Sequence, residues 1–450
     1  MTRPDVEVEV AVLGAGPAGS IAARELARAG VLTCLIDPGR TVTGHGIESF
    51  PASGAALAND IGLLTPLCAA SDGPAGGMQM VWRDTPEARQ YDGDGPLLLH
   101  RAQVHAALRD LAGETPNCTT RITRVRDVRP LGPGMVVTGD DGPLTCNLVI
   151  DARGRAVNAD AQTDLMALPL SGISAPPQDP FMHIEALADG WIWACCLSDG
   201  AVTGAIFQSA RALAGTSAQD RQVYADQCLK STSLPQMDQV TLARPCPAGL
   251  AVAEDPLPGR RHILIGDAAL ARDPISSHGL VHAMRSAVQG AIVARTILAP
   301  DGDAGAAESF LRQKHHEAVR AARAATAQAY LDQTRHRTPF WSASQKPEPL
   351  PAMPDIRSGP VELAFPLTRA PVLDHDRIRW TPALETGLKG DVVTHFGPLN
   401  AVDIAAACRP PAPLPEIASR LGARHPLPQV FEALEHLAQR GVFVQARRSV

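Results

Sequence analysis

A glycine-rich turn near the N-terminus constrains the fold more than any other feature of the sequence. Residues 8–13 are typical of a strand and residues 20–30 of a helix, and the stretch "GAGPAG" between them follows G-x-G-x-x-G at Gly14, Gly16 and Gly19. The first glycine permits a tight turn, the second admits a pyrophosphate, and the third lets the helix pack on the strand. The sequence therefore predicts a β-α-β unit whose helix N-terminus binds phosphate.

A second strand over residues 31–37 ends in Asp37, 23 residues after Gly14. An acid at this position is placed to bind a ribose hydroxyl, which favours FAD or NAD over NADP. We therefore expect the turn and the second strand to hold a dinucleotide through six residues: Gly14, Gly16, Pro17, Ala18, Gly19 and Asp37.

The composition of the 450-residue chain argues against several other classes of protein. Its net charge of −6 gives no general attraction to nucleic acid or anionic membranes. No apolar run approaches the ~18 residues typical of a membrane-spanning helix, and the N-terminus lacks the apolar core of a signal peptide. The nine cysteines contain no C-x-x-C pair, which argues against a zinc site or a secreted disulfide scaffold. We expect a cytoplasmic protein with no metal and with no nucleic-acid or membrane partner.

The stretch "ILIGDAALARDPISSHGLVHAMRSA" (263–287) resembles the second flavin signature of the aromatic-hydroxylase-like FAD superfamily. The resemblance implies FAD as cofactor, with Asp267 accepting a hydrogen bond from the ribityl chain and the loop at Asp273 and Pro274 lying along the isoalloxazine. It also implies that the helix after "SSHG" directs its N-terminus, with Ser277 and Gly279, at the flavin. Unpaired helix N–H groups and the helix dipole stabilise the negative charge of reduced flavin. In "LLLHRAQVHAALRD", Arg101 matches the arginine with which this superfamily contacts FAD.

The segment "LVIDARGRAV" (148–157) resembles a third element of the superfamily, which hydroxylases often write with an Asp-Gly pair. Here Arg153 precedes Gly154, so the acid is missing. Because that element helps hydroxylases handle NAD(P)H, we leave two sources of electrons open: NAD(P)H directly, or a separate flavin reductase.

Two further segments resemble the flavin-dependent tryptophan halogenases and related monooxygenases. "GHGIESFPASGAALANDIGL" (44–63) loosely matches their G-E-S-L-P segment, and Trp191-Ile192-Trp193 matches half of a W-x-W-x-I-P box whose other half is replaced by Cys195 and Cys196. A halogenase of this type needs a lysine in its N-terminal third to hold hypohalous acid. The first lysine of this chain is Lys230. The resemblance therefore implies a monooxygenase rather than a halogenase.

The implied chemistry is oxygen transfer from the cofactor. Reduced FAD adds O₂ at C4a, and an electron-rich aromatic ring attacks the distal oxygen of the resulting hydroperoxide, while the protein excludes water and orients the substrate. Four polar residues are candidates for general acid or base near the flavin: His45, Glu48, Asp273 and His278. Trp82, Trp191 and Trp193 are candidates for the wall of the substrate pocket, although a strand that packs in the core explains Trp191 and Trp193 equally well.

We predict an α/β protein: a Rossmann-type FAD-binding domain with an inserted, mainly antiparallel-sheet substrate domain and a small C-terminal winged-helix-like domain. The predicted boundaries are 1–75, 97–165 and 255–335 for the FAD-binding domain and 76–96 and 166–254 for the substrate domain. Eight prolines between Thr338 and Pro371 argue against a helix or a central strand, so residues 336–370 are predicted to be a linker. Residues 371–450 form the winged-helix-like docking domain.

The charge of the C-terminal segment bears on its partner. Residues 371–450 carry nine basic and eight acidic side chains, and Glu432 and Glu435 lie on the helix that would read DNA. Such a balance is poor for phosphate contacts, so we expect protein or peptide binding. A cytoplasmic FAD monooxygenase with a docking module resembles the flavoprotein monooxygenases of tryptophylquinone biogenesis in quinohemoprotein amine dehydrogenase. That resemblance implies hydroxylation of a tryptophan side chain in a small protein, presented with or without a radical-SAM maturation enzyme.

Three alternatives stay open at this point. They are a flavin-dependent halogenase, a geranylgeranyl-reductase-like FAD oxidoreductase that acts on long lipids, and a non-enzymatic flavin-binding regulator that binds DNA.

Overall fold

The computed structural model describes all residues except 1–6, 40–45, 158–163, 343–358, 389–390 and 447–450. The chain divides into two compact units. The first comprises residues 1–291 and 314–347, and the second comprises residues 292–313 and 348–450. Among the described residues, no helix combines the length and apolar character needed to cross a membrane.

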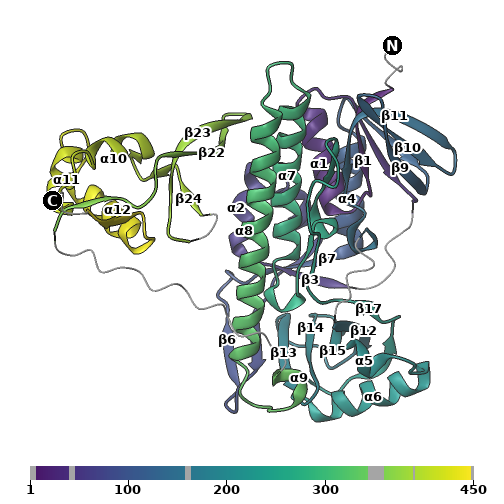
Figure 1. Cartoon of the computed structure of the whole chain (residues 1–450). Coiled ribbons are helices and arrows are strands. Elements are labelled where there is room, and N and C mark those ends of the chain that lie inside the picture. Colours follow the sequence, from purple (N-terminus) through teal and green to yellow (C-terminus); the bar gives the residue numbers. More distant parts are fainter. Residues whose placement is uncertain (1–6, 40–45, 158–163, 343–358, 389–390, 447–450) are drawn as a thin grey trace. The chain divides into compact units, whose positions relative to one another are not determined.

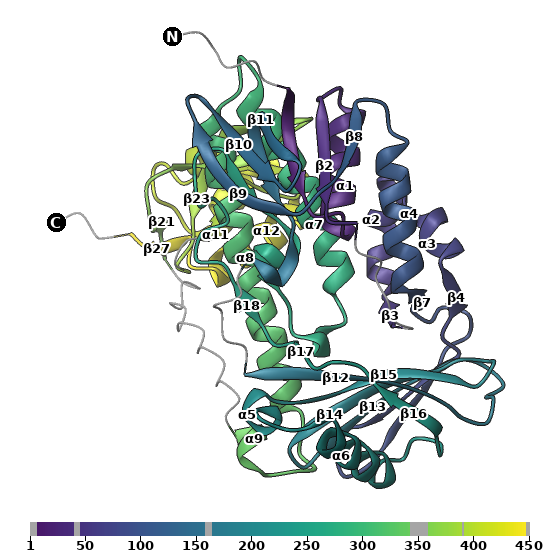
Figure 2. The ribbon, with the colours of Figure 1, turned by 90° about the vertical axis from the view of Figure 1, so that its right-hand side faces the viewer.

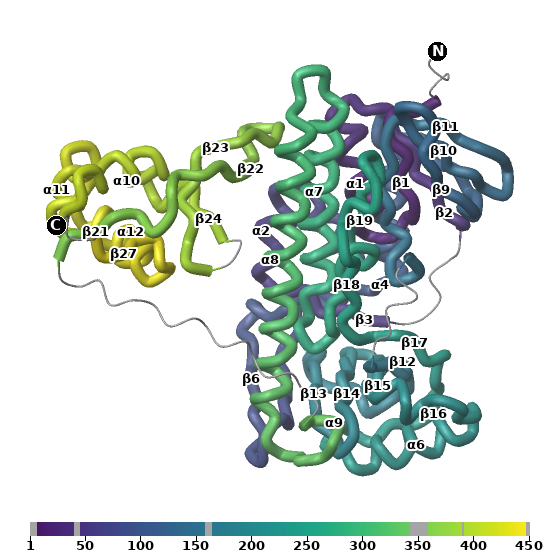
Figure 3. The backbone as a smooth tube through the Cα atoms, in the orientation of Figure 1, coloured from purple at the N-terminus to yellow at the C-terminus, as the bar shows by residue number. Residues whose placement is uncertain are grey.

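A seven-stranded sheet forms one half of the first unit, with strand order β8-β2-β1-β11-β10-β9 and β19 added beside β11. Its central pairs are parallel, whereas β9 and β10 continue it in antiparallel fashion. Figure 3 shows how distant segments meet in it, from purple β1 to teal β19. The strands are β1 (Val8–Leu13), β2 (Thr33–Asp37), β8 (Cys118–Ile122), β9 (Val125–Leu131), β10 (Gly134–Gly139), β11 (Gly142–Asp151) and β19 (His262–Leu264).

The helices of this half follow from the sequence pattern. Helix α1 (Pro17–Arg28) begins with proline at its first position, where the missing N–H costs nothing, and packs against α4 (Arg101–Gly113). Within the segment 261–269, only β19 is a strand. The chain then turns through the short helix η2 (Gly266–Ala268), with Gly266 at a φ of 56°. The shorter elements nearby are β18 (Ala251–Val252), β20 (Leu270–Ala271), η1 (Gly154–Ala156) and η3 (Pro274–Ser276).

An eight-stranded, mainly antiparallel sheet forms the other half of the first unit, in the order β16-β12-β15-β14-β13-β5-β6 with β17 beside β12 (Figure 2). Only β13 and β5 pair in parallel. The strands are β5 (Gly77–Val81), β6 (Glu87–Gln90), β12 (Leu165–Ile173), β13 (Phe181–Leu187), β14 (Gly190–Cys196), β15 (Ala201–Ser209), β16 (Asp238–Leu242) and β17 (Cys246–Pro247).

The two faces of this sheet pack against different partners. One face packs against α6 (Ala218–Ser231), which buries Ala225 and Cys228 against it, and the short α5 (Ala210–Leu213) precedes α6. The sequence predicts a mainly antiparallel-sheet domain over residues 166–254, and α6 is a helix that this prediction did not include. A capping box formed by Ser217 and Asp220 marks its start and was the available signal. The other face packs against Trp341 and the end of α8.

Smaller elements connect the two halves. A three-stranded sheet runs in the order β3-β7-β4 (Ile47–Phe50, Leu97–His100 and Ser71–Pro74), next to α2 (Ala52–Asp60) and α3 (Leu64–Ala69). The long helices α7 (Gly279–Leu298) and α8 (Ala304–Leu331) lie side by side (Figure 1), and α9 (Pro339–Ser342) follows.

The described residues of the second unit after residue 348 form three helices and several short strands. Helices α10 (Ala401–Ala407), α11 (Leu414–Gly422) and α12 (Leu427–Gln439) share one apolar core with β21 (Val361–Leu363) and β27 (Phe443–Gln445). The other strands are β22 (Thr368–Asp374), β23 (Arg377–Glu385), β24 (Val392–Val393), β25 (His395–Phe396) and β26 (Leu399–Asn400). The winged-helix assignment stays a prediction.

The proline-rich segment is less irregular than expected. Residues 336–370 include α9, β21 and the start of β22, whereas residues 343–358 lie outside the described part. Two of the prolines lie within regular secondary structure, at positions that tolerate proline. Pro339 begins α9, where no N–H is needed, and Pro371 lies in β22, which has only β23 beside it in its three-stranded sheet.

All nine cysteines are free thiols. Cys195 and Cys196, the adjacent pair, are both fully buried and belong to clusters on opposite faces of the sheet, as expected for consecutive residues of a strand. Burial raises the pKa of eight of the nine thiols: Cys34, Cys118, Cys146, Cys195, Cys196, Cys228, Cys246 and Cys408.

Candidate active site

The glycine turn has the geometry of a phosphate cradle. Gly14 adopts a φ of 94°, which an L side chain rarely takes, and a Cβ there would lie 2.7 Å from the carbonyl oxygen of Ala152. A Cβ at Gly19 would lie 1.9 Å from the carbonyl oxygen of Gly14. A Cβ at Gly16, by contrast, would meet no protein atom within 4 Å. Gly14 and Gly19 therefore pack tightly against neighbouring backbone, whereas the space in front of Gly16 is free of protein atoms. This space lies at the N-terminus of α1, where the helix dipole and free N–H groups stabilise an anion.

Asp37 joins this cradle from the end of β2. Its Oδ2 accepts a hydrogen bond from the backbone N–H of Ala15 at 2.9 Å, and its Oδ1 accepts one from Gly39 N–H at 2.8 Å. A cavity of about 340 Å³ opens beside it, lined among others by Leu35, Arg109 and Thr120. This cavity lies where the adenosine part of a dinucleotide bound at the turn would extend.

A second group of residues converges on the same end of the sheet. Gly266 lies against α1, since a Cβ there would lie 2.7 Å from Cβ of Ala18. The next residue, Asp267, has 46% of its side chain accessible, so its carboxylate is available to a ligand. Burial raises the pKa of Asp267, and the positive charges of Arg155 and Arg101 oppose that rise. Its carboxylate lies 3.8 Å from Nε of Arg155.

Glu48 and Arg101 meet at the start of α7. Strands β3 and β7 pair so that Glu48 faces Leu99, which brings Oε2 of Glu48 to 3.8 Å from Nε of Arg101. A Cβ added to Gly279, the first residue of α7, would lie 3.5 Å from Oε1 of Glu48. The structure thus brings together three residues that the sequence had assigned to the flavin site from three separate motifs.

Of the three predicted acid-base candidates that the structure describes, Asp273 is the most buried, with 5% of its surface exposed. Its Oδ1 accepts from Ile275 N–H at 3.0 Å and caps η3, and the Tyr330 hydroxyl donates to its Oδ2 at 3.5 Å. Burial raises the pKa of Asp273 to about 6, although the bonds from Ile275 and Tyr330 and the charge of Arg155 pull it down. A carboxyl of this kind exchanges a proton near neutral pH.

The other predicted residues of this loop lie at its end. Pro274 opens η3, and Ser277 adopts a left-handed conformation with a φ of 47°, just before α7. His278 is exposed, and its Nδ1 contacts the carbonyl oxygen of Ser276. His45 lies outside the described residues.

Two arginines were not recognised as organising residues from the sequence. The sequence had indicated only that Arg153 stands where many hydroxylases have an aspartate. In the structure, Arg153 forms a bidentate ion pair with the fully buried Asp151, through Nε–Oδ1 at 2.9 Å and Nη2–Oδ2 at 2.6 Å. Arg155 donates to the carbonyl oxygens of Ala248, Gly249 and Arg272 and so ties three loops together. The "D-A-R-G-R" spacing was the only sequence signal for either arginine.

The tryptophans predicted to line the substrate pocket have different surroundings. Trp191 is 1% exposed and stacks on Phe207 at 3.8 Å between ring centroids, and Trp82 packs edge-on against both Trp191 and Trp341. The indole N–H of Trp191 donates to the hydroxyl of Tyr330 at 3.2 Å. Trp193 is half-buried at the margin of the same cluster. Trp191 and Trp82 are thus packed in an aromatic core that reaches Asp273 through Tyr330.

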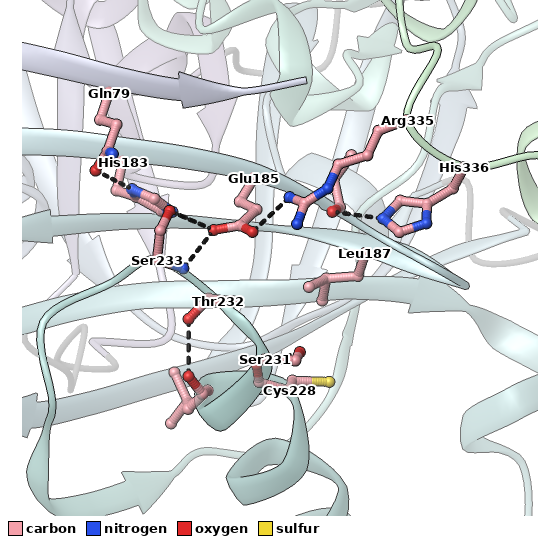
Figure 4. Close-up of polar contacts among 12 residues, drawn as sticks. Gln79, His183, Glu185, Leu187, Cys228, Ser231, Thr232, Ser233, Arg335 and His336 are labelled. Atoms are coloured by element: carbon pink, nitrogen blue, oxygen red, sulfur yellow. Dashed lines mark hydrogen bonds and ion pairs between the residues drawn. The ribbon is translucent and has the colours of Figure 1, made fainter. Parts of the chain in front are cut away.

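A buried charge network holds the same sheet together (Figure 4). The carboxylate of Glu185 accepts from His183 Nε2 at 3.0 Å, from the N–H and hydroxyl of Ser233, and from Arg335 Nη1 at 2.6 Å. Burial alone would raise the pKa of Glu185, but the bonds from His183, Ser233 and Arg335 outweigh it and hold the pKa at about 2. The Glu185 carboxylate is buried, whereas the Arg335 side chain is 31% exposed, and the network joins β13 to the segment after α8.

The residues present fit FAD. The open space in front of Gly16 suits a pyrophosphate, Asp37 and its cavity suit the adenosine end, and the accessible carboxylate of Asp267 is chemically suited to accept a hydrogen bond from a ribityl hydroxyl. Among the described residues, no group of three or more histidine, cysteine or acidic side chains is arranged to hold a metal ion.

Comparison with known families agrees with this geometry. The family model of tryptophan halogenases matches residues 98–357, which is more than half of the chain, and the model of an FAD-binding domain matches residues 7–126. No protein of curated function matches the chain.

Several solved structures share the fold. The peptidyl tryptophan dihydroxylase QhpG, described as essential for tryptophylquinone cofactor biogenesis, is 24% identical and aligns over 97% of this chain and 100% of its own, with a TM-score of 0.75. The flavin-dependent halogenase CmlS is 17% identical over 99% of both chains, with a TM-score of 0.78. A geranylgeranyl bacteriochlorophyll reductase-like protein from Thermoplasma acidophilum is 17% identical over 73% of this chain and 88% of its own, with a TM-score of 0.56.

Proposed function

The chain belongs to the tryptophan halogenase family, and from this premise we propose that it is an FAD-dependent monooxygenase that hydroxylates a tryptophan side chain in a protein or peptide. The proposed setting is the biogenesis of a tryptophylquinone cofactor. The observation that carries the choice of oxygenation over halogenation is the absence of any lysine before Lys230.

The proposed roles follow from the positions of the side chains. Gly14, Gly16, Pro17, Ala18, Gly19 and Asp37 would hold the pyrophosphate and adenosine, and Arg101, Asp267, Pro274, Ser277 and Gly279 would hold the flavin end. Bound FAD, once reduced, supplies the chemistry of oxygen transfer from O₂. Asp273 would take up or release the proton that hydroxylation of a ring requires, because it titrates near neutral pH and lies in a water-poor loop.

The aromatic core supports a site from which water is excluded. Trp82, Trp191 and Trp341 bury the side of the eight-stranded sheet next to Asp273. A dry wall of this kind would protect the oxygen-transfer step from hydrolysis. Glu48, next to Arg101 and the start of α7, would act at the flavin, and His278 would act from the exposed side of the loop.

A protein substrate is supported by likeness along the whole chain to a dihydroxylase of peptidyl tryptophan. The presence of the second unit does not by itself favour a protein substrate, because the halogenase CmlS also aligns over 99% of the chain. We propose that the second unit docks the protein substrate, presented with or without a radical-SAM maturation enzyme. Electrons for FAD would come from NAD(P)H directly or through a separate flavin reductase.

Mass spectrometry of a tryptophan-bearing substrate protein tests the proposal. The substrate is incubated with the enzyme, reduced FAD, ¹⁸O₂ and bromide, and its peptides are sequenced. We expect tryptophan peptides that gain ¹⁸O and no bromine, and no product with the Gly16→Ala variant, whose methyl group would occupy the space proposed for the pyrophosphate.

The alternatives have their own readouts in the same experiment. Bromine on tryptophan would replace the proposal with halogenation, which the family match and the likeness to CmlS favour. Saturation of an added isoprenoid lipid, with no oxygen incorporated, would replace it with a reductase. No change in any tryptophan peptide would overturn it.

A further inference from the structure

We propose that Tyr330 is a positioning residue that holds the Asp273 carboxyl in one orientation and sets its affinity for a proton. The inference rests on the proposed function only in assigning Asp273 a role in proton exchange. The contacts between the two side chains are independent of what the substrate is.

Tyr330 lies at the penultimate position of α8 and connects two elements that are distant in sequence. Its hydroxyl donates to Oδ2 of Asp273 at 3.5 Å and accepts from the indole N–H of Trp191 at 3.2 Å. A phenol has one proton to donate, and the indole can only donate. The two hydrogen bonds therefore run in one direction, with Trp191 donating to Tyr330 and Tyr330 donating to Asp273.

The aromatic core restricts where the phenol can point. The ring of Tyr330 lies 5.5 Å from that of Trp341 and 6.2 Å from that of Phe340. Burial raises the pKa of the Tyr330 phenol, so the hydroxyl keeps its proton and remains a donor at every pH at which Asp273 titrates.

The segment that follows Tyr330 is fixed to the eight-stranded sheet, and this fixes Tyr330 in turn. Arg335 bonds Glu185 at 2.6 Å, His336 Nε2 lies 3.1 Å from the carbonyl oxygen of Ala186, and the Trp341 indole N–H donates to the carbonyl oxygen of Leu187 at 2.9 Å. Figure 4 shows Arg335 and His336 reaching toward this strand. Three successive residues of β13 thus anchor the segment.

Few other groups act on Asp273. Its Oδ1 accepts from Ile275 N–H, and Arg155 is the nearby cation. Burial favours the neutral acid, whereas the bonds from Ile275 and Tyr330 and the charge of Arg155 favour the carboxylate. Weakening the bond from Tyr330 therefore raises the proton affinity of Asp273.

The chain offers a direct probe because it has only three tyrosines, Tyr91, Tyr224 and Tyr330. Full-length protein with FAD bound is labelled with 3-fluorotyrosine and followed by ¹⁹F NMR as the pH is varied, and Tyr330→Phe identifies the resonance. We expect the Tyr330 resonance to shift as Asp273 ionises, at a pH above the ordinary range of an aspartate, and those of Tyr91 and Tyr224 to stay constant over that range.

Two variants separate positioning from packing. Asp273→Asn removes the titrating group and is expected to abolish the pH dependence. Trp191→Phe keeps a ring on Phe207 but removes the donor to Tyr330, and is expected to raise the midpoint by about half a pH unit. A purely structural role for Tyr330 would leave its resonance insensitive to pH.

The outcomes distinguish this inference from the proposed function. A flat Tyr330 resonance, or one that still titrates in Asp273→Asn, overturns the positioning role even if tryptophan is hydroxylated. A titrating resonance with no hydroxylation keeps the role and removes the proposed function. If both hold, Tyr330→Phe is expected to move the corresponding limb of the kcat pH profile upward by about half to one unit with KM unchanged.

Discussion

The glycine cradle and the eight-stranded sheet lie in the same unit and are stabilised in different ways. In the cradle, the decisive feature is missing side chains: Gly14, Gly19 and Gly266 let backbone segments approach so closely that a methyl group would overlap a neighbour. In the sheet, the decisive feature is buried side chains that join distant segments, such as Glu185 and Arg335, which are 150 residues apart. The difference teaches that an added methyl group at Gly14 or Gly19 is the damaging change in the cradle, whereas the loss of a buried partner such as Glu185 is the damaging change in the sheet.

The largest expected effect comes from adding one methyl group to the cradle. Gly19→Ala places a Cβ 1.9 Å from the carbonyl oxygen of Gly14, so α1 and the turn have to separate. We expect FAD affinity to fall by at least about 100-fold together with a loss of stability. Fluorescence titration with FAD and urea unfolding of the apoprotein measure the two effects.

Gly16→Ala is the matched control for this substitution. Its Cβ meets no protein atom within 4 Å, so the apoprotein should unfold at the wild-type urea concentration while FAD binding is lost. Normal FAD binding by Gly16→Ala would show that the pyrophosphate does not lie in front of the turn.

A second prediction removes one charge from the sheet. Glu185→Gln leaves Arg335 and His183 without their carboxylate, and we expect the free energy of unfolding at neutral pH to fall by about 3–5 kcal/mol. The pKa of Glu185 is lowered to about 2, so its contribution is fully present above the ordinary glutamate pKa of 4.5 and is lost as the pH falls toward 2. The difference between wild type and variant should shrink over that range in urea unfolding.

Glu87→Gln is the control for this variant, because Glu87 is exposed on β6 of the same sheet. It should change stability by less than about 0.5 kcal/mol. Equal effects of the two substitutions would remove the buried network as a source of stability.

A third prediction concerns the two tryptophans of β14. Trp191→Ala opens a cavity in the aromatic core and is expected to cost about 3–5 kcal/mol, whereas Trp193→Ala, at the half-buried margin, should cost clearly less. Calorimetric unfolding of both variants compares them. If Trp193→Ala is the more damaging, Trp191 is not the core residue of the pair.

The smallest expected effect is that of neutralising Asp273. Burial raises its pKa from an ordinary 3.8 to about 6, so the folded protein loses stability as the pH rises through that window. Asp273→Asn has no carboxylate to ionise, and we expect it to be about 1–3 kcal/mol more stable than wild type near pH 8, with the difference vanishing near pH 4. A constant difference across this range would contradict the raised pKa.

The same comparison explains what the sequence was able to predict. The Rossmann-type half was predictable because its constraints are local: a strand, three glycines and a helix all lie between Val8 and Asp37. The flavin-facing segments were located through resemblance, and the structure then brought Glu48, Arg101 and Gly279 together.

The rest depends on long-range contacts that leave little trace in the sequence. Nothing near Tyr330 indicates that it bonds Asp273 and Trp191, because that pairing depends on where α8 ends relative to the sheet. The role of Trp191 was left open between a pocket wall and core packing, and only the stacking on Phe207 places it in the core. The helix α6 was missed although its capping box was visible, since the strand-like residues around it dominated the pattern.

The protonated thiols have a consequence for the durability of the protein. An oxygenase that fails to reach its substrate releases hydrogen peroxide, which attacks thiolates rather than thiols. Burial holds the pKa of Cys118, Cys196 and Cys408 at about 11 and that of Cys146 at about 12, so almost none of these sulfurs is ionised at neutral pH. The packing around these four cysteines therefore protects them from this by-product, and oxidation during uncoupled turnover should begin at an exposed thiol, Cys68 or Cys246.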